Sequence, residues 1–183
     1  TQYGYLPATE NQYIGFSLYQ EFNLDYYQEI KLENVPASAL VQDKLFQAIQ
    51  AFVKGDKLYL QHQYLAAIDS YKEGKRGIEQ LGTEFDLMMV LERLARTQWQ
   101  AGLWEEALKT YQKLTELLTQ LPSTIETREK MIQIYTQQGM LYDLIGLRKQ
   151  AIDCYQQALA VGDIYLPNWQ KKAQKYLKER YQK

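Results

Sequence analysis

The sequence is poor in the residues that build disulfide frameworks, metal sites and membrane spans. Among 183 residues it has one cysteine, Cys154, and one histidine, His62. A single cysteine cannot form an internal disulfide, and one residue of each type is too few for a zinc site made by the protein alone. The apolar runs are far shorter than the roughly 20 residues that a membrane-spanning helix needs. We therefore expect a soluble, cytoplasmic protein that holds no metal or other cofactor and does not insert into a membrane.

An excess of charge of one sign is also missing. The chain has 21 lysines and arginines against 22 acidic residues, a net charge of -1. It therefore has no overall field that would attract nucleic acid. The two ends differ, however, since residues 1–35 hold five acids against Lys31 and residues 165–183 hold six bases against Glu179. We interpret the basic end as a solvated helix, because few aromatic residues are interleaved with its charges, and we expect no nucleic-acid partner.

Three stretches of the chain superimpose on one another without gaps: residues 55–74, 95–114 and 139–158. They share a small residue, then an alanine, an aliphatic residue and a tyrosine, in the columns Gly55/Ala95/Gly139, Ala67/Ala107/Ala151, Ile68/Leu108/Ile152 and Tyr71/Tyr111/Tyr155. Within each half of a unit the apolar positions recur every three or four residues, which favours a helix packed on one face. Each unit is therefore predicted to be a pair of antiparallel helices.

Glycine marks the predicted turn between the two helices in two of the three units. Gly102 and Gly146 fall just before the second helix, where a tight turn needs a residue that adopts positive φ, and His62 takes this place in the first unit. After the third unit, Trp169, Ala173 and Tyr176 repeat the spacing of a first helix, which indicates a closing half-repeat with a basic outer side formed by Lys171, Lys172, Lys175, Lys178 and Arg180. The predicted helices cover residues 37–60, 64–80, 84–100, 104–120, 124–144, 148–161 and 168–182.

The small-residue, alanine and aromatic spacing of the three units resembles the tetratricopeptide repeat family, over about 130 residues. The period departs from the standard 34 residues, because Ala67 to Ala107 is 40 residues and Ala107 to Ala151 is 44. The chain is thus more similar to the long-helix variety of the family, as in kinesin light chains. The resemblance implies an all-α fold, a right-handed solenoid of three hairpins plus a C-terminal capping helix, over residues 36–183.

Residues 1–35 do not fit the repeat, and we treat them as a separate acidic, aromatic leader. Its segment through Phe22, Tyr26, Tyr27 and Ile30 is too apolar to stand in water alone. Three interpretations stay open: the leader covers the exposed face of the first hairpin, it lies in the groove as an intramolecular ligand, or it binds a second protein.

Groups that could carry out catalysis are scarce. Residues 74–77 (Gly-Lys-Arg-Gly) lack both the spacing and the hydroxyl residue of a phosphate-binding loop. Glu105 and Glu106 stand at a predicted helix start, where acids favour the helix dipole. Cys154 has no predicted basic neighbour that would activate it. We therefore predict that the chain is not an enzyme.

The resemblance implies that the first helix of each pair lines a concave groove that takes a peptide. The inward side chains would include Asp56, Met89, Glu92, Gln133, Thr136, Met140 and Asp143, together with the predicted partner-binding residues Phe52, Tyr59, Arg93, Arg96, Trp99 and Gln137. Arginine and aromatic side chains are the usual energetic anchors of interfaces. The alternative is that Glu92 and Arg96, four residues apart, merely pair on a solvated face and that Trp99 only packs.

The function expected from these features is binding of a protein or peptide partner, as a non-catalytic scaffold or assembly factor. Two alternatives remain open: a structural subunit of a large complex, and a regulatory sensor that responds to a peptide.

Overall fold

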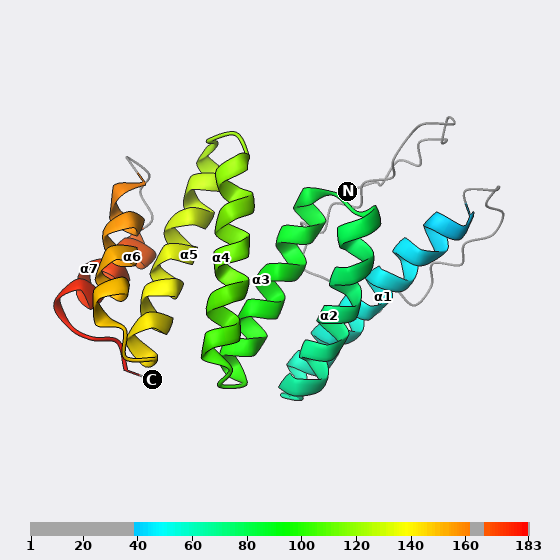
Figure 1. Cartoon of the computed structure of the whole chain (residues 1–183), viewed down its shortest axis with the longest axis horizontal. Helices are drawn as coiled ribbons and strands as arrows, with labels where there is room; N and C mark the ends of the chain where they lie inside the picture. The colour runs from blue at the N-terminus through cyan, green and yellow to red at the C-terminus, as the bar shows by residue number, and fades with distance from the viewer. Residues whose placement is uncertain (1–38, 162–166, 183) are drawn as a thin grey trace.

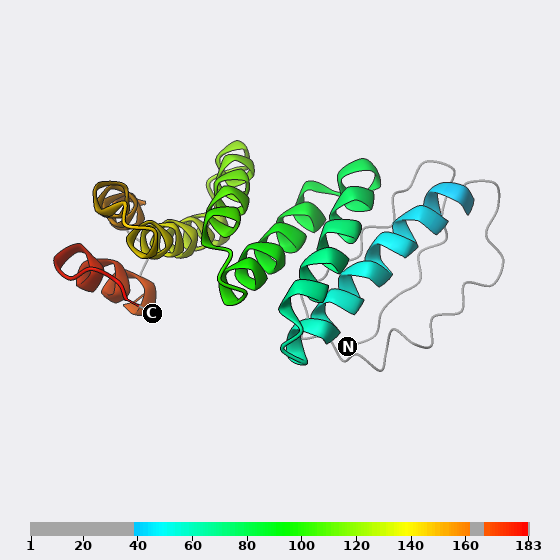
Figure 2. The same ribbon diagram turned by 60° about the horizontal axis from the view of Figure 1, so that its bottom comes forward.

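The computed structural model describes residues 39–161 and 167–182, and all regular structure in these ranges is helical. The seven helices are α1 (Ala39–Leu60), α2 (Tyr64–Leu81), α3 (Glu84–Gln100), α4 (Trp104–Gln120), α5 (Ile125–Leu144), α6 (Arg148–Ala160) and α7 (Pro167–Lys178). They follow one another in sequence order from one end of the molecule to the other (Figures 1 and 2). The predicted all-α stack of helical hairpins is confirmed. The predicted leader, and its boundary with the repeats at residue 36, lie outside the described residues.

The three hairpins turn in the same way. The residue in the third position after the first helix donates its N–H to a carbonyl five residues back: Gln63 to Leu58, Leu103 to Gln98 and Leu147 to Tyr142, at 2.8–2.9 Å. The residue before it has positive φ in each case, +60° for His62, +78° for Gly102 and +88° for Gly146. This is the helix C-terminal motif in which a left-handed residue lets the last carbonyls find donors. The role predicted for these three positions is confirmed.

Since histidine pays a steric penalty in the left-handed region that glycine avoids, the first turn is strained relative to the other two. We expect His62→Gly to raise the free energy of unfolding by about 0.5–1 kcal/mol, although it removes the exposed hydrogen bond between His62 Nδ1 and the Tyr64 hydroxyl. The matched control is His62→Ala, which loses the same bond and keeps the penalty. Urea denaturation of both variants checks this, and an alanine variant as stable as the glycine variant would contradict it.

Each hairpin is closed by a tyrosine of its second helix that lies against a small residue of its first. A Cβ added to Gly55 would lie 2.6 Å from the ring of Tyr71, and one added to Gly139 would overlap the ring of Tyr155. All three repeat tyrosines are fully buried. The small residues in this column therefore allow the ring to pack directly on the backbone of the partner helix.

The core runs through the stack as three overlapping clusters. The first joins α1, α2 and α3, the second joins α3, α4 and α5, and the third joins α5, α6 and α7. Leu87 packs against the first two clusters, whereas Trp99 and Tyr142 pack against the last two. Each hairpin thus buries its apolar side on the next one, which is how a repeat stack gains stability that a single hairpin lacks.

The C-terminal end departs from the predicted helix over 168–182. Helix α7 ends at Lys178, and the residues after it fold back onto α5. Arg180 was predicted to be a solvated outer cation. It is exposed, but its guanidinium also donates to the main-chain oxygen of Asp143 at 2.6 and 3.0 Å. The ring of Tyr181 lies between Tyr176 and Trp99, with centroid distances of 5.1 and 6.2 Å. Residues 179–182, the C-terminal tail, therefore join α7 to α5 and α3.

Candidate functional site

The candidate site lies on α1 and α3, the first helices of the first two hairpins. These two helices pack on each other, as α5 and α7 do at the other end of the stack. We call the face shared by the first helices α1, α3 and α5 the inner face. It carries polar and aromatic side chains that are not fully buried in the hairpin cores, chiefly Tyr59 of α1 with Arg93 and Arg96 of α3.

Asp56 connects the two helices. Its carboxylate accepts a hydrogen bond from the Tyr71 hydroxyl and lies 3.7 Å from Nε of Arg93. Burial raises the pKa of Asp56 above its ordinary value, while the Tyr71 hydroxyl, Arg93 and Arg96 act in the opposite direction. The side chain of Arg93 keeps 35% of its surface exposed. Its guanidinium is thus oriented by one partner and still open to a second.

Arg96 is exposed and lies over an aromatic ring. Its guanidinium carbon is 5.5 Å from the ring centroid of Tyr59, within the range of a cation–π contact. That ring in turn meets Tyr64 at 5.6 Å. The ring of Tyr59 therefore orients the side chain of Arg96 without cancelling its positive charge.

One helical turn before Arg96 on α3, Glu92 pairs with Lys130 of α5 at 2.5 Å. The predicted alternative, a pair between Glu92 and Arg96, is not among the ion pairs of the described residues. The hydroxyl of Tyr111 on α4 is buried and has no hydrogen-bond partner in the described part of the chain. Burial, and then the charge of Glu92, raise the pKa of this hydroxyl above its usual range. Tyr111 therefore stays a neutral donor, close enough to Arg96 for that charge to act on its pKa.

Several predicted inward residues belong to the core instead. Phe52 is 1% exposed and packs on Tyr71 with a centroid distance of 5.6 Å, so its predicted contact with a partner is corrected. Thr136, Met140 and Asp143 are buried as well. Phe52 and Thr136 stand three before Gly55 and Gly139, close to the side of the helix that packs against the second helix.

Trp99 and Gln137 have intermediate exposure. Trp99 packs against two core clusters and against Tyr181 of the C-terminal tail, so much of its ring is used within the chain. Gln137 has a buried side-chain oxygen with no hydrogen-bond partner in the described ranges. The structure thus brings together Tyr59, Arg93 and Arg96 at the junction of α1 and α3, and it places Trp99 beside the C-terminal tail.

Cys154 and His62, the candidate reactive residues of the sequence, lie in a helix core and in a hairpin turn. Burial, and then Asp153, raise the pKa of the Cys154 thiol to about 12, so that it is not a thiolate near neutral pH. His62 occupies the hairpin turn. In residues 39–161 and 167–182, no group of three or more histidine, cysteine or acidic side chains is placed to hold a metal ion. No helix in the same ranges is both long and apolar enough to cross a membrane.

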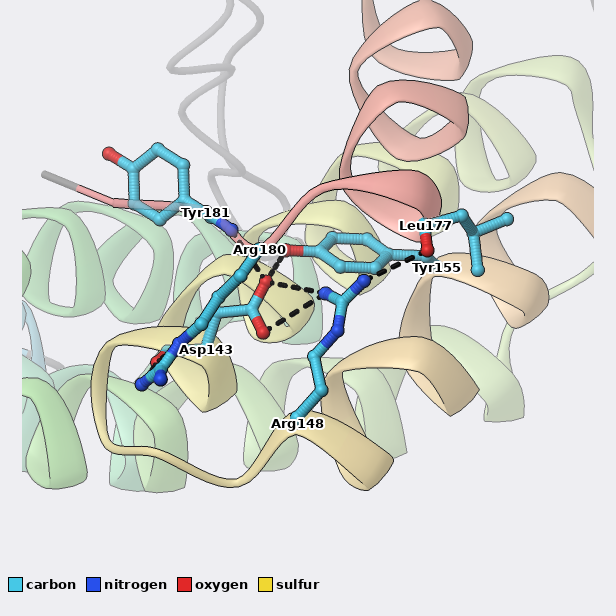
Figure 3. A network of polar contacts seen from close by, with 6 residues as sticks. All are labelled: Asp143, Arg148, Tyr155, Leu177, Arg180 and Tyr181. Atoms are coloured by element: carbon cyan, nitrogen blue, oxygen red, sulfur yellow. Dashed lines mark hydrogen bonds and ion pairs between the residues drawn. The ribbon is translucent and has the colours of Figure 1, made fainter.

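The sequence interpretation missed two groups. One is the cluster around the buried carboxylate of Asp143, which accepts hydrogen bonds from Arg148, the Tyr155 hydroxyl and the main-chain N–H of Tyr181 (Figure 3). The other is a set of lysines and arginines on the second helices α2 and α4, which recur at three- and four-residue spacing at partly or fully exposed positions: Lys72, Lys75, Arg76, Lys109 and Lys113. That spacing was available as a signal, but only the fold shows that the two helices face each other across α3.

The comparison with protein families bears on the fold. The tetratricopeptide repeat family model matches residues 90–124, which cover most of α3, all of α4 and the loop after it. Among proteins with curated descriptions, none matches the sequence.

Proposed function

We propose that the chain holds a segment of another protein on the inner face of its stack of hairpins, in which residues 90–124 match the tetratricopeptide repeat family model. Repeats of this kind generally mediate contacts between proteins, through surfaces that several repeats build together. A scaffold or assembly role follows from this proposal, with the junction of α1 and α3 as the main contact.

The observation that carries the proposal is the pair of oriented arginines. Arg93 is directed by Asp56 and Arg96 by the ring of Tyr59, and both guanidinium groups stay open to solvent. Arginine and tyrosine are among the residues that most often dominate binding energy. Groups that are already held in place lose less conformational entropy on binding than free ones. A partner segment with a carboxylate beside an apolar side chain would match them, because a carboxylate can accept two hydrogen bonds from one guanidinium.

The test is a quantitative pull-down from native lysate with the Arg93→Ala/Arg96→Ala variant. We expect its affinity for the main partner to fall about tenfold or more, since truncation of an interface anchor costs on the order of 1–2 kcal/mol. Trp99 is left unchanged because its substitution would also disturb two core clusters.

The matched control is Lys149→Ala/Lys171→Ala, which removes two exposed positive charges on α6 and α7. We expect it to bind as the unchanged chain does. Melting curves identify any loss of folding, and Arg96→Ala alone serves if the loss of Arg93 destabilises the α1–α3 contact. Retention of every partner at unchanged strength by folded arginine variants would contradict the proposal.

A further inference from the structure

An open cleft of about 590 Å³ lies between the second helices α2 and α4. Its floor is formed by α3, with the apolar side chains Leu91 and Leu94. Its walls carry five cations, three from α2 and two from α4: Lys72, Lys75, Arg76, Lys109 and Lys113. We call this the cationic cleft. It is built mainly by the second helices, and the inner face by the first helices, so it is a separate surface.

The cations of the cleft are compensated only in part. Glu79 pairs with Lys75 at 2.9 Å and with Lys113 at 2.6 Å. Burial would raise the pKa of this carboxyl, but the two lysines outweigh burial and lower it. In the described part of the chain, Lys72, Arg76 and Lys109 form no ion pair. The cleft therefore suits an occupant with several carboxylates along one side.

The chain itself contains a segment with this chemistry, outside the described residues. Acidic residues recur at every fourth position in residues 21–33: Glu21, Asp25, Glu29 and Glu33. Phe22, Tyr26 and Ile30 follow them at the same spacing. The cations of the cleft have this spacing too, as Lys72 with Arg76 on α2 and Lys109 with Lys113 on α4. We propose that residues 21–33 dock in the cationic cleft of the same molecule, with their carboxylates against its lysines and arginine.

Measured along α1, residues 34–38 are long enough to bring the chain back to the level of the cleft. Helix α1 packs antiparallel to α2, with Ala48 directly against Gly74 and Gly77, which are neighbours of the cleft residue Arg76. From Ala48 back to the start of α1 at Ala39 is a helical rise of roughly 14 Å. Residues 34–38 can extend over about 17 Å. The connection therefore spans the distance from the end of α1 to the level of Arg76 without any change in the hairpins.

The test is zero-length carbodiimide cross-linking of the full chain at low concentration, with the linked residues mapped by mass spectrometry. This reagent joins a carboxylate to a lysine only where the two are in contact. We expect links from the acids of residues 21–33 to Lys72, Lys109 or Lys113, within one copy of the chain. They should fade as salt is raised, because exposed charge pairs are screened.

Two variants make the result specific. Arg76→Glu/Lys109→Glu should lower the yield of links to Lys72 and Lys113 about tenfold, because the two substitutions lower the net charge of the site by four units. Lys149→Glu/Lys171→Glu changes the net charge equally at exposed positions elsewhere and should leave the links unchanged. Circular dichroism verifies that both variants are folded.

Three outcomes would overturn the proposal. Links spread evenly over all exposed lysines would show that the acids have no fixed position. Links between two copies would assign the cleft to a second molecule. A cleft that forms no links to residues 21–33 but binds poly-glutamate or RNA would belong to a separate acidic partner. None of these depends on whether Arg93 and Arg96 bind a partner, so the two proposals fail independently.

Discussion

Replacing Asp143 by alanine is expected to lower the free energy of unfolding by about 3–5 kcal/mol. The carboxylate is fully buried on α5 and accepts from Arg148 at 2.9 and 3.1 Å, from the Tyr155 hydroxyl at 3.0 Å and from the main-chain N–H of Tyr181 at 2.8 Å (Figure 3). Its removal leaves three donors without their acceptor. The side chain of Arg148 is 30% exposed and can regain some water, so we expect the lower part of the range.

Urea denaturation followed by circular dichroism measures the loss. Asp143→Asn is the matched control, because it keeps the size of the side chain and one acceptor oxygen but removes the charge that faces Arg148. We expect it to fall between the alanine variant and the unchanged chain. A loss below about 1 kcal/mol for alanine, the value of an exposed ion pair, would show that the cluster is not a structural link.

The same substitution reports on the C-terminal tail. The amide of Tyr181 donates to Asp143 in the folded chain and is therefore expected to exchange slowly with solvent. In Asp143→Ala we expect rapid exchange at Tyr181, together with unchanged exchange in α1 and α2, which have no contact with the cluster. Equal protection of Tyr181 in both proteins would mean that the ring contacts with Trp99 and Tyr176 hold the tail by themselves.

The second large effect is expected at Gly139. A Cβ at this position would overlap the buried ring of Tyr155, which packs on Gly139 across the third hairpin. We expect Gly139→Val to lower the free energy of unfolding by about 3 kcal/mol, the upper part of the range for overpacking a core. Gly139→Ala should cost less, because its better helix propensity offsets about 1 kcal/mol of the strain.

A double-substitution cycle locates the cause. In a Tyr155→Leu background the ring is absent, so we expect Gly139→Ala to be close to neutral there, and the coupling between the two sites to be measurable. Gln156→Val, at an exposed position of α6, controls for the low helix propensity of valine. If Gly139→Ala costs the same with and without the Tyr155 ring, the close approach is not what requires glycine.

The helices and turns could be predicted because their signals are local. The positions of Gly102 and Gly146, five residues before an alanine and nine before a tyrosine, identified the hairpin turns, and His62 was found through the same alignment column. The predicted first and last residues of α3 and α4 agree with the structure. Propensity and periodicity decide such features within one or two helical turns, so no knowledge of distant contacts is needed.

The end of α7 and the identity of the inner residues could not be predicted in this way. Residues 179–182 are compatible with a helix. They leave it because the main-chain N–H of Tyr181 donates to the buried carboxylate of Asp143, which is far away in the sequence. Phe52 and Arg93 both stand within three residues of a small residue, yet one faces the second helix and the other faces solvent. The difference depends on the angle around the helix, which the alignment of units did not include.

We expect the partner to be held on the inner face at the junction of α1 and α3. The most direct measurement is site-specific photo-cross-linking, with a photoreactive amino acid in place of Gln100, an exposed residue of α3 one helical turn after Arg96. The matched position is Glu116, an exposed residue of α4 on the second helix of the same hairpin. We predict a covalent adduct with one defined protein from position 100, lost in the Arg93→Ala/Arg96→Ala background, and none from position 116. Adducts of equal yield from both positions, or an adduct at position 100 that persists without the two arginines, would contradict the account.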